Sequence, residues 1–215
     1  MKIYKNWHFP DNEKHFIQYM EEMGLDVYQQ KQRDASFKFL DNFRNAIDIG
    51  ANVGLWARDM CKTFQHVILI EPYNPNIECL SKNLEEFNNF EIFEVALSNK
   101  SGLKNLYFNK ESVGGSTIRK HDLSNFAEQI PVNVKMLDEY SFTEIDYIKI
   151  DVQFHELEVI EGAINTLKNN YPVLCIESAR RNLDELRYVK KFVKILEDLG
   201  YRVVGEAGKE LFFKK

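Results

Sequence analysis

The chain has 215 residues, of which 44% are hydrophobic and 28% charged, so it can bury the core of one globular domain with a small appendage. This composition excludes a fibrous or disordered chain, and the net charge of -5, with basic residues interspersed among acids, argues against a dedicated nucleic-acid binder. The sequence has neither a signal-peptide stretch nor an apolar run of membrane-spanning length, so we expect a soluble cytoplasmic protein.

Residues 1–43 are expected to form an N-terminal helical extension. The sequence Phe9-Pro10-Asp11 predicts the start of a first helix, and a second helix is expected over residues 28–40. On the second helix, Arg33 and Asp34 either reach over the loop that follows or form an ordinary surface pair. The surface pair is the more common arrangement.

The stretch AIDIGANVG, Ala46 to Gly54, is an apolar strand that ends in an acid and a loop of small residues. We expect a strand over residues 45–49 and a helix from Val53 onward, with the loop facing a ligand. Such a junction presents free backbone N–H groups and the positive end of a helix. The spacing D-x-G-x-N-x-G differs from the G-x-G-x-x-G of dinucleotide enzymes because Asn52 replaces the middle glycine, and asparagine tolerates a left-handed turn.

From residue 45 onward, strand and helix patterns alternate, which predicts an α/β fold with a Rossmann-like, doubly wound sheet. The further strands are expected at residues 66–72, 90–97, 145–151 and 171–178. Helices are expected at 75–87, at 155–169 and before Gly200, and the chain closes with a hairpin. Residues 98–131 are expected to be an insertion or flap, with extended pieces at 103–109 and 116–119 around Gly114-Gly115, and an edge piece at 132–137.

Polar residues follow several of these strands, at the sheet edge where open α/β proteins bind ligands. They are the loop Gly50–Gly54, Glu71, the corner Val95–Ser98 and Asp151. Glu71 lies 71 − 48 = 23 residues after Asp48, close to the spacing of roughly 20 at which an acid binds ribose hydroxyls. The alternative is that Glu71 caps the helix that follows Pro72.

Five segments resemble the FkbM family of S-adenosylmethionine-dependent methyltransferases, in order and in spacing. They are DIGANVG, IEPYNPN, VALSNKSG, IDYIKIDVQFHELEVIEGA and PVLCIES, and they cover about residues 45–180. The resemblance implies a class I methyltransferase fold, with a mainly parallel seven-stranded sheet whose last strand is antiparallel. It places the S-adenosylmethionine-binding methyltransferase domain at residues 44–215, after the N-terminal extension.

The resemblance also implies which residues bind the cofactor S-adenosyl-L-methionine. The loop after the first strand would approach the methionine part, Glu71 the ribose, Ala96 and Leu97 the adenine, and Asp151 the methionine end and the reaction centre. The expected cofactor-binding residues are Asp48, Gly50, Ala51, Asn52, Gly54, Glu71, Pro72, Ala96, Leu97 and Asp151. The family usually reads D-V-E-G-x-E where this chain has D-V-Q-F-H-E, so Gln153 and Phe154 replace a glutamate and a glycine.

Methyl transfer to an alcohol requires that the acceptor loses a proton. His155 is the side chain whose unperturbed pKa best suits a base, with Asp151 and Glu156 as carboxylate alternatives or orienting partners. His155 could equally be a helix N-terminal residue without chemistry, and the helix dipole explains Glu156. Phe154 is expected either to line the acceptor pocket or to pack against the N-terminal helices or the flap. Lys149 faces a helix layer or holds a carboxylate such as Glu177.

The cysteines and histidines add constraints on cofactors. Cys61, Cys79 and Cys175 lie far apart on apolar segments, so we expect reduced core residues in an intracellular protein. The histidines lack metal-ligand spacing, and no metal is expected.

The resemblance implies O-methylation of a hydroxyl on a sugar, glycan or small metabolite, with nucleic acid an unlikely partner. One alternative is a cofactor-binding module of the same fold without catalysis, since Gln153 and Phe154 depart from the family. The other is a nicotinamide-dependent oxidoreductase, which Asn52 disfavours because it breaks G-x-G-x-x-G.

Overall fold

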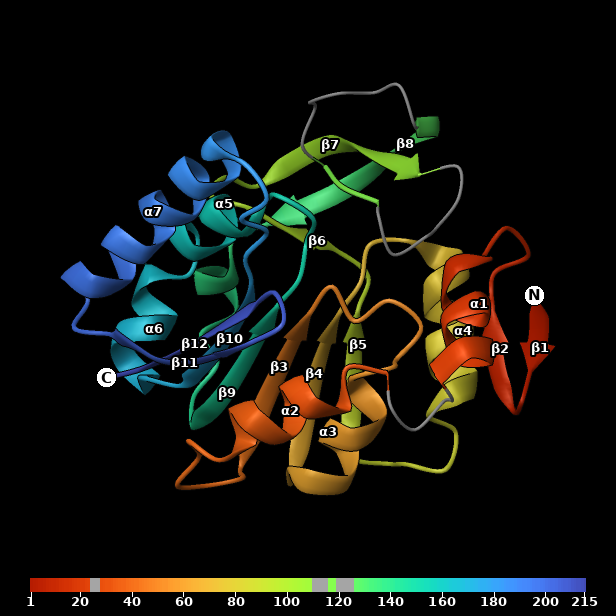
Figure 1. Ribbon diagram of the computed structural model, residues 1–215, viewed down its shortest axis with the longest axis horizontal. Coiled ribbons are helices and arrows are strands. Elements are labelled where there is room, and N and C mark those ends of the chain that lie inside the picture. The colour runs from red at the N-terminus through yellow and green to blue at the C-terminus, as the bar shows by residue number, and fades with distance from the viewer. Residues whose placement is uncertain (24–27, 110–115, 119–125) are drawn as a thin grey trace.

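A seven-stranded sheet forms the centre of the molecule (Figure 1). The computed structural model describes residues 1–23, 28–109, 116–118 and 126–215. The strand order is β11-β12-β10-β9-β3-β4-β5, and β12 runs antiparallel to both of its neighbours. The doubly wound sheet with an antiparallel last strand is therefore confirmed. Its strands are β3 (Asn45–Ile49), β4 (His66–Ile70), β5 (Phe90–Phe93), β9 (Ile145–Ile150), β10 (Val173–Glu177), β11 (Arg202–Ala207) and β12 (Glu210–Lys214).

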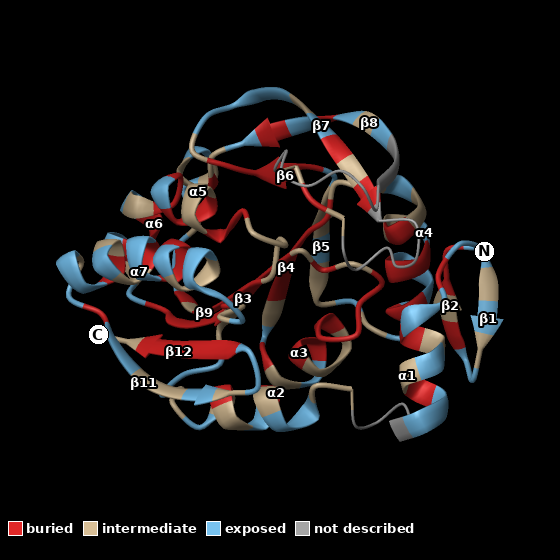
Figure 2. Cartoon of the chain, turned by 45° about the horizontal axis from the view of Figure 1, so that its top comes forward, coloured by how far each residue is buried: buried red, intermediate tan, exposed pale blue. Residues whose placement is uncertain are grey.

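Helices cover both faces of the sheet, as the continuous apolar runs of the central strands require. Ile47 and Ile49 point to the face covered by α5, α6 and α7, whereas Ala46 packs on the opposite face with residues of α3 and α4. The buried strands lie between these helix layers (Figure 2). The helices are α2 (Gln30–Phe37), α3 (Ala57–Thr63), α4 (Asn74–Asn83), α5 (Glu156–Glu161), α6 (Ile164–Asn170) and α7 (Leu183–Asp198).

The N-terminal segment is not purely helical, which differs from the prediction of a helical extension. A hairpin of β1 (Lys2–Tyr4) and β2 (Trp7–Phe9) precedes the first helix, α1 (His15–Met23). The sequence pattern missed the hairpin because its strands are short and its turn residues, Lys5 and Asn6, both adopt positive φ without glycine. The hairpin and α1 pack together on the start of α3 and on α4, through buried residues that include Phe9, Met20, Leu55 and Cys79.

The expected strand over residues 90–97 is divided between two sheets. After β5 the chain turns, with Val95 N–H donating to the carbonyl of Phe93 at 2.9 Å, and β6 (Ala96–Leu97) joins a second sheet. That sheet has the order β6-β8-β7 and lies beyond the carboxyl ends of β3 and β4 (Figure 1). Its other strands are β7 (Gly102–Asn109) and β8 (Phe126–Lys135).

The predicted insertion is therefore mostly β structure. We call β7, β8 and residues 116–118 the β arm, and the expected edge piece at 132–137 is part of the longer β8. Ser116 to Ile118 run beside β7, where Thr117 pairs with Tyr107. Gly114, Gly115 and Arg119 lie outside the described residues. The 3-10 helix η3 (Leu137–Tyr140) leads from the arm back to β9.

The helix expected over residues 155–169 is two helices, α5 and α6, separated near Gly162. A side chain at Gly162 would overlap the backbone carbonyl of Ser98, so the glycine permits a close approach to the corner after β6. Sequence periodicity does not report such a contact. Among the described residues, no helix is long and apolar enough to cross a membrane.

Candidate functional site

The loop after β3 is a tight turn whose backbone N–H groups donate to acceptors in the loop itself and at the end of β4. Gly50, Asn52 and Gly54 all have positive φ, which explains the D-x-G-x-N-x-G spacing. The N–H groups of Gly50 and Ala51 donate to the carbonyl of Ile70, that of Asn52 to Glu71, that of Val53 to the Asn52 side chain, and that of Gly54 to Ala51. The expectation of free N–H groups is therefore wrong for residues 50–54. This loop has no N–H groups left for a pyrophosphate.

Glu71 ties this loop to the start of α4. Its Oε2 accepts from the Asn52 N–H at 2.9 Å, and its Oε1 accepts from the Tyr73 N–H at 3.0 Å and from Asn76 Nδ2 at 3.2 Å. Burial raises the pKa of Glu71 to about 7, although these three bonds oppose the rise. Because a carboxylate can accept about four bonds, Glu71 supports the helix start and keeps capacity for a ligand.

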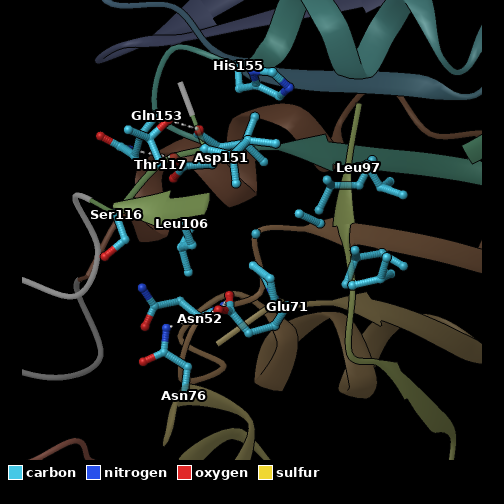
Figure 3. Close-up of a pocket in the computed structure, with 18 residues that line it drawn as sticks. Asn52, Glu71, Asn76, Leu97, Leu106, Ser116, Thr117, Asp151, Gln153 and His155 are labelled. Atoms are coloured by element: carbon cyan, nitrogen blue, oxygen red, sulfur yellow. Dashed lines mark hydrogen bonds between the residues drawn. The ribbon is translucent and has the colours of Figure 1, made fainter. Parts of the chain in front are cut away.

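A narrow pocket, here called the strand-end pocket, lies beyond β3, β4 and β9 beneath the β arm (Figure 3). Asn52, Glu71 and Asn76 gather at one end, while Asp151 and Gln153 lie at the other. Asn76 Oδ1 and Ser116 Oγ are buried in its wall and have no hydrogen-bond partner within the described part of the chain. Buried polar atoms of this kind require a ligand or water. Predicted residues that line it are Gly50, Asn52, Glu71, Pro72, Ala96, Leu97, Asp151 and His155.

The strand-end pocket has a volume of only about 60 Å³. Ligand pockets usually measure roughly 300–1,000 Å³, so a nucleoside requires the pocket to widen. Leu106, Ser116, Thr117 and Ile118 of the β arm form one wall. The β arm therefore limits the width of the pocket on that side.

A second, larger cavity of about 610 Å³, here called the open cavity, adjoins the first. Gly50, Asn52, Asp151 and Gln153 line both cavities, so the two meet at the ends of β3 and β9. The N-terminal helical segment and the N-cap of α3 supply aromatic walls, and the sheet supplies acids. The aromatic residues are Phe16, Tyr19, Tyr28 and Trp56, and the acids are Asp151, Glu177 and Glu210.

Lys149 holds carboxylates beneath the open cavity, which is one of its two predicted roles, but its partners are Asp48 and Asp151 instead of Glu177. Its Nζ lies 3.2 Å from Asp48 Oδ1 and 3.7 Å from Asp151 Oδ2. Burial lowers the pKa of Lys149, but the two acids raise it by more, so the lysine is charged. Asp48, fully buried, lines neither cavity and neutralises this lysine.

The loop after β9 has a strained backbone, which Glu156 holds in place through hydrogen bonds. Gln153 and Phe154 both have positive φ, at 52° and 67°, a conformation that favours glycine. This explains the family's glycine at position 154. Glu156 Oε1 accepts from the N–H groups of Val152 and Phe154, at 3.3 and 3.1 Å, and so fixes the loop. Burial raises the pKa of Glu156 to about 7.

Within this loop, Gln153 joins two acids that sequence reasoning did not bring together. Its Nε2 donates to Asp151 Oδ1 at 2.7 Å and to Glu177 Oε2 at 2.8 Å. Burial, and then the charge of Asp151, raise the pKa of Glu177 to about 9. Glu177 ends β10, so the strand-end rule could have found it.

The remaining predicted residues lie away from the open cavity. Phe154 packs near Tyr188 of α7, with ring centroids 6.4 Å apart, and lines a small separate cavity with Glu156. His155 Nε2 lies 2.9 Å from Ser98 Oγ, and its Nδ1 lies 3.5 Å from Glu158. His155 therefore faces the Ala96–Leu97 side of the strand-end pocket. Gly54 lies below the loop against Leu80.

Helix α2 and the residue before it, Gln29, lie beside the open cavity. Arg33 is buried and pairs with Asp59 at 2.7 Å, so the expected surface pair with Asp34 is wrong. Gln29 accepts from Trp56 Nε1 at 2.5 Å and donates to Glu210 at 3.3 Å. The three cysteines are free and buried, as predicted.

The sheet order, the antiparallel last strand and a pocket at the strand ends define the class I methyltransferase fold, and solved structures share it. A methyltransferase FkbM from Methylobacillus flagellatus KT aligns with a TM-score of 0.54 and 16% identity, over 81% of this chain and 44% of that one. A ribosomal protein L11 methylase from Lactobacillus delbrueckii subsp. bulgaricus gives 0.52 and 10%, over 88% and 78%. A precorrin 8w decarboxylase from Methanobacterium thermoautotrophicum gives 0.50 and 12%, over 86% and 90%. At these identities the likeness shows the fold.

The family model for the methyltransferase FkbM domain matches residues 48–203, which is more than half of the chain. The protein therefore belongs to the FkbM methyltransferase family, and its cofactor is S-adenosylmethionine. No curated protein matches the chain with significance. The chain spans less than half of the length of the Methylobacillus structure.

Proposed function

We propose that this protein transfers a methyl group from S-adenosylmethionine to a hydroxyl group of a sugar, glycan or small metabolite. The observation that carries the proposal is the meeting of two cavities at Asp151 and Gln153. One cavity has the acid and amide groups that a nucleoside needs. The other is open to solvent and is large enough for an acceptor.

The residues present fit the cofactor. Glu71 has the capacity to accept from ribose hydroxyls, and the orphaned Asn76 Oδ1 lies beside it as a further acceptor. Ala96 and Leu97 supply an apolar surface for adenine, and Asp151 lies where the pocket opens toward the acceptor. The bound cofactor supplies the methyl group at that opening. A dinucleotide fits less well, because the N–H groups that would bind its pyrophosphate are already used.

Asp151 and Glu177 are the groups we assign to the acceptor's proton. Both line the open cavity, whereas His155 lines only the strand-end pocket and Glu156 lines neither. The methyl carbon would bond to the acceptor oxygen as its bond to the cofactor's sulfur breaks, and one of these two carboxylates would take the acceptor's proton and pass it to solvent. His155 remains a candidate for adenine recognition on the opposite side.

The walls of the open cavity support a polyhydroxylated acceptor. Aromatic rings such as Trp56 and Tyr28 bind flat C–H faces, and the acids and Gln29 bind hydroxyls. The aromatic side chains come mainly from the N-terminal helical segment. We therefore assign acceptor recognition to that segment and cofactor binding to the sheet.

Methyl transfer from labelled S-adenosylmethionine to a panel of sugars, glycans and hydroxylated metabolites tests this function. We expect label in at least one hydroxylated acceptor, with turnover lost in Asp151→Asn but binding of S-adenosylhomocysteine retained. Binding of the cofactor with no transfer to any acceptor would instead favour a module without catalysis. Binding of NAD in place of S-adenosylmethionine would overturn the proposal.

A further inference from the structure

The geometry points to the Asp151–Gln153–Glu177 bridge as a cation-sensing proton site. We propose that the bridge holds a proton in the cofactor-free protein and releases it when the sulfonium cofactor binds, so that the protein distinguishes S-adenosylmethionine from its neutral, demethylated product by charge. This inference rests on the proposed function, because it places the cofactor's charged centre beside Asp151.

The first support is the arrangement of the bridge. A single amide nitrogen donates to both carboxylates, at 2.7 and 2.8 Å, and thereby holds the two acids close together. Two neighbouring carboxylates repel each other when both are ionised, so one of them tends to keep a proton. Gln153 is neutral, whereas the family's usual glutamate would add a third negative charge. The backbone at Gln153 is left-handed and therefore strained. This conformation places the side-chain amide between the two acids.

The second support is the shortage of positive charge around the bridge. From β9, Lys149 already lies between Asp48 of β3 and Asp151. From the β11–β12 turn, Lys209 reaches Glu177 at 3.4 Å but is 60% exposed, and Glu210 adds a buried acid. On the cavity rim, Arg181 pairs with Glu185 at 2.9 Å.

Within the described part of the chain, the other elements that line the cavities near the bridge place further acids and neutral groups beside it. Helix α5 contributes a further buried acid, Glu156, and the segment before α2 contributes the neutral Tyr28 and Gln29. Burial of Glu177, and then the negative charge of Asp151, raise the pKa of Glu177 to about 9. Burial, the neighbouring acid and the shortage of cations therefore all favour a proton on the bridge.

A sulfonium ion placed beside such a site favours its ionised form, and the thioether product does not. The amino acid and nucleoside parts are common to both ligands, so the difference between them isolates the sulfonium charge. By linkage, the affinity of a ligand that releases one proton rises by up to about tenfold for each unit by which the pH increases toward the pKa of the site. The ionised bridge is then ready to take the acceptor's proton.

Isothermal titration of the intact protein with S-adenosylmethionine and with S-adenosylhomocysteine tests this inference. Measurements in buffers of different ionisation enthalpy, from about pH 7 to pH 9, count the protons released. We expect S-adenosylmethionine to release up to one proton more than S-adenosylhomocysteine, and its relative affinity to rise with pH by up to about tenfold per unit. Protons released through Glu71 are common to both ligands and cancel.

Glu177→Gln should abolish this difference while S-adenosylhomocysteine still binds, which shows that the variant is folded. Gln153→Glu should enlarge the difference, because it adds a third acid to the bridge. Glu206→Gln, at an exposed acid on the same terminal hairpin, is the matched control and should behave as the wild type. Equal proton counts for the two ligands, or an unchanged difference in Glu177→Gln, would overturn the inference while the proposed function stands. Failure of both ligands to bind would overturn the proposed function itself.

Discussion

Gly50 and Asp151 touch so closely that no other residue fits at position 50. A Cβ on Gly50 would overlap the backbone carbonyl oxygen of Asp151. The φ of Gly50 is +84°, which a residue with a side chain rarely adopts. This contact joins the glycine loop after β3 to the strand end that carries Asp151, so the two halves of the site are built on one another.

Gly50→Ala should therefore destabilise the protein and weaken the cofactor site together. The left-handed backbone costs roughly 1–2 kcal/mol, and displacement of the Asp151 carbonyl adds to it. We expect a fall in Tm of several degrees and a loss of more than about tenfold in S-adenosylhomocysteine affinity. Gly102→Ala is the control, because Gly102 also has positive φ but has open space around it. If both variants bind the ligand equally well, the contact with Asp151 does not shape the site.

Glu71→Gln should weaken both S-adenosylmethionine and S-adenosylhomocysteine. The amide cannot accept from Asn52 and Tyr73 at once, and it loses the charge-assisted bond to ribose, worth about 1.5–3 kcal/mol or more than tenfold in affinity. The raised pKa of Glu71, about 7, adds a signature. Affinity for S-adenosylhomocysteine should rise from pH 6 to pH 8 in the wild type, as the carboxylate ionises, but not in the variant.

Calorimetric titration at each pH, with the exposed Glu78→Gln on α4 as the control, checks this prediction. A folded Glu71→Gln protein with wild-type affinity would show that the carboxylate supports only the start of α4.

The stability of the cofactor-free protein should fall as the pH rises above about 5. In the folded state the pKa values of Glu71 and Glu156 are about 7 and that of Glu177 is about 9, whereas an unfolded glutamate titrates near about 4.3. Between these values the folded protein binds more protons than the unfolded chain, so the free energy of unfolding decreases with rising pH.

Scanning calorimetry from pH 5 to pH 9 measures this dependence, and we expect Tm to be highest near pH 5 to 6. Glu177→Gln should remove the decline above about pH 7 and make the decline below it shallower, because Glu71 and Glu156 contribute only below about pH 7. A Tm that rises steadily toward pH 8 would contradict the burial of uncompensated acids.

Phe154 offers a test of backbone strain that is separate from binding. Both Phe154→Ala and Phe154→Gly lose the ring contact with Tyr188, but only glycine relaxes at φ 67°. The glycine variant should therefore be more stable than the alanine variant by about 1 kcal/mol, and both less stable than the wild type. Denaturant unfolding measures the difference, and S-adenosylhomocysteine affinity should stay within about twofold. A large loss of affinity would place the ring in the cofactor site after all.

The central strands were predictable because buried parallel strands are continuous apolar runs. The strand over residues 45–49 matches β3 to the residue, and β9 and β10 differ from their predictions only at their ends. The β1–β2 hairpin and the break at Gly162 were not predictable. One depends on a two-residue turn without glycine, and the other on a contact with Ser98 that lies 64 residues earlier (162 − 98).

The site was predictable only as far as strand ends reveal it. Glu71 and Asp151 stand at such ends, but the partnership of Asp151 with Glu177 depends on register. Ile150 pairs with Ile176, so the next residue of each strand, Asp151 and Glu177, lie side by side. Neither the register nor the left-handed turn at Gln153 leaves a signal in one sequence, and so the bridge between the acids could not be inferred from it.

A crystal structure of the protein with S-adenosylhomocysteine is the most direct test of the central claim. We predict that the ribose hydroxyls lie within hydrogen-bond distance of Glu71, with adenine between Ala96 and Leu97 and the β arm moved outward to admit the nucleoside. The sulfur should point past Asp151 into the open cavity. A nucleoside bound elsewhere, or a sulfur that faces away from the open cavity, would contradict this account.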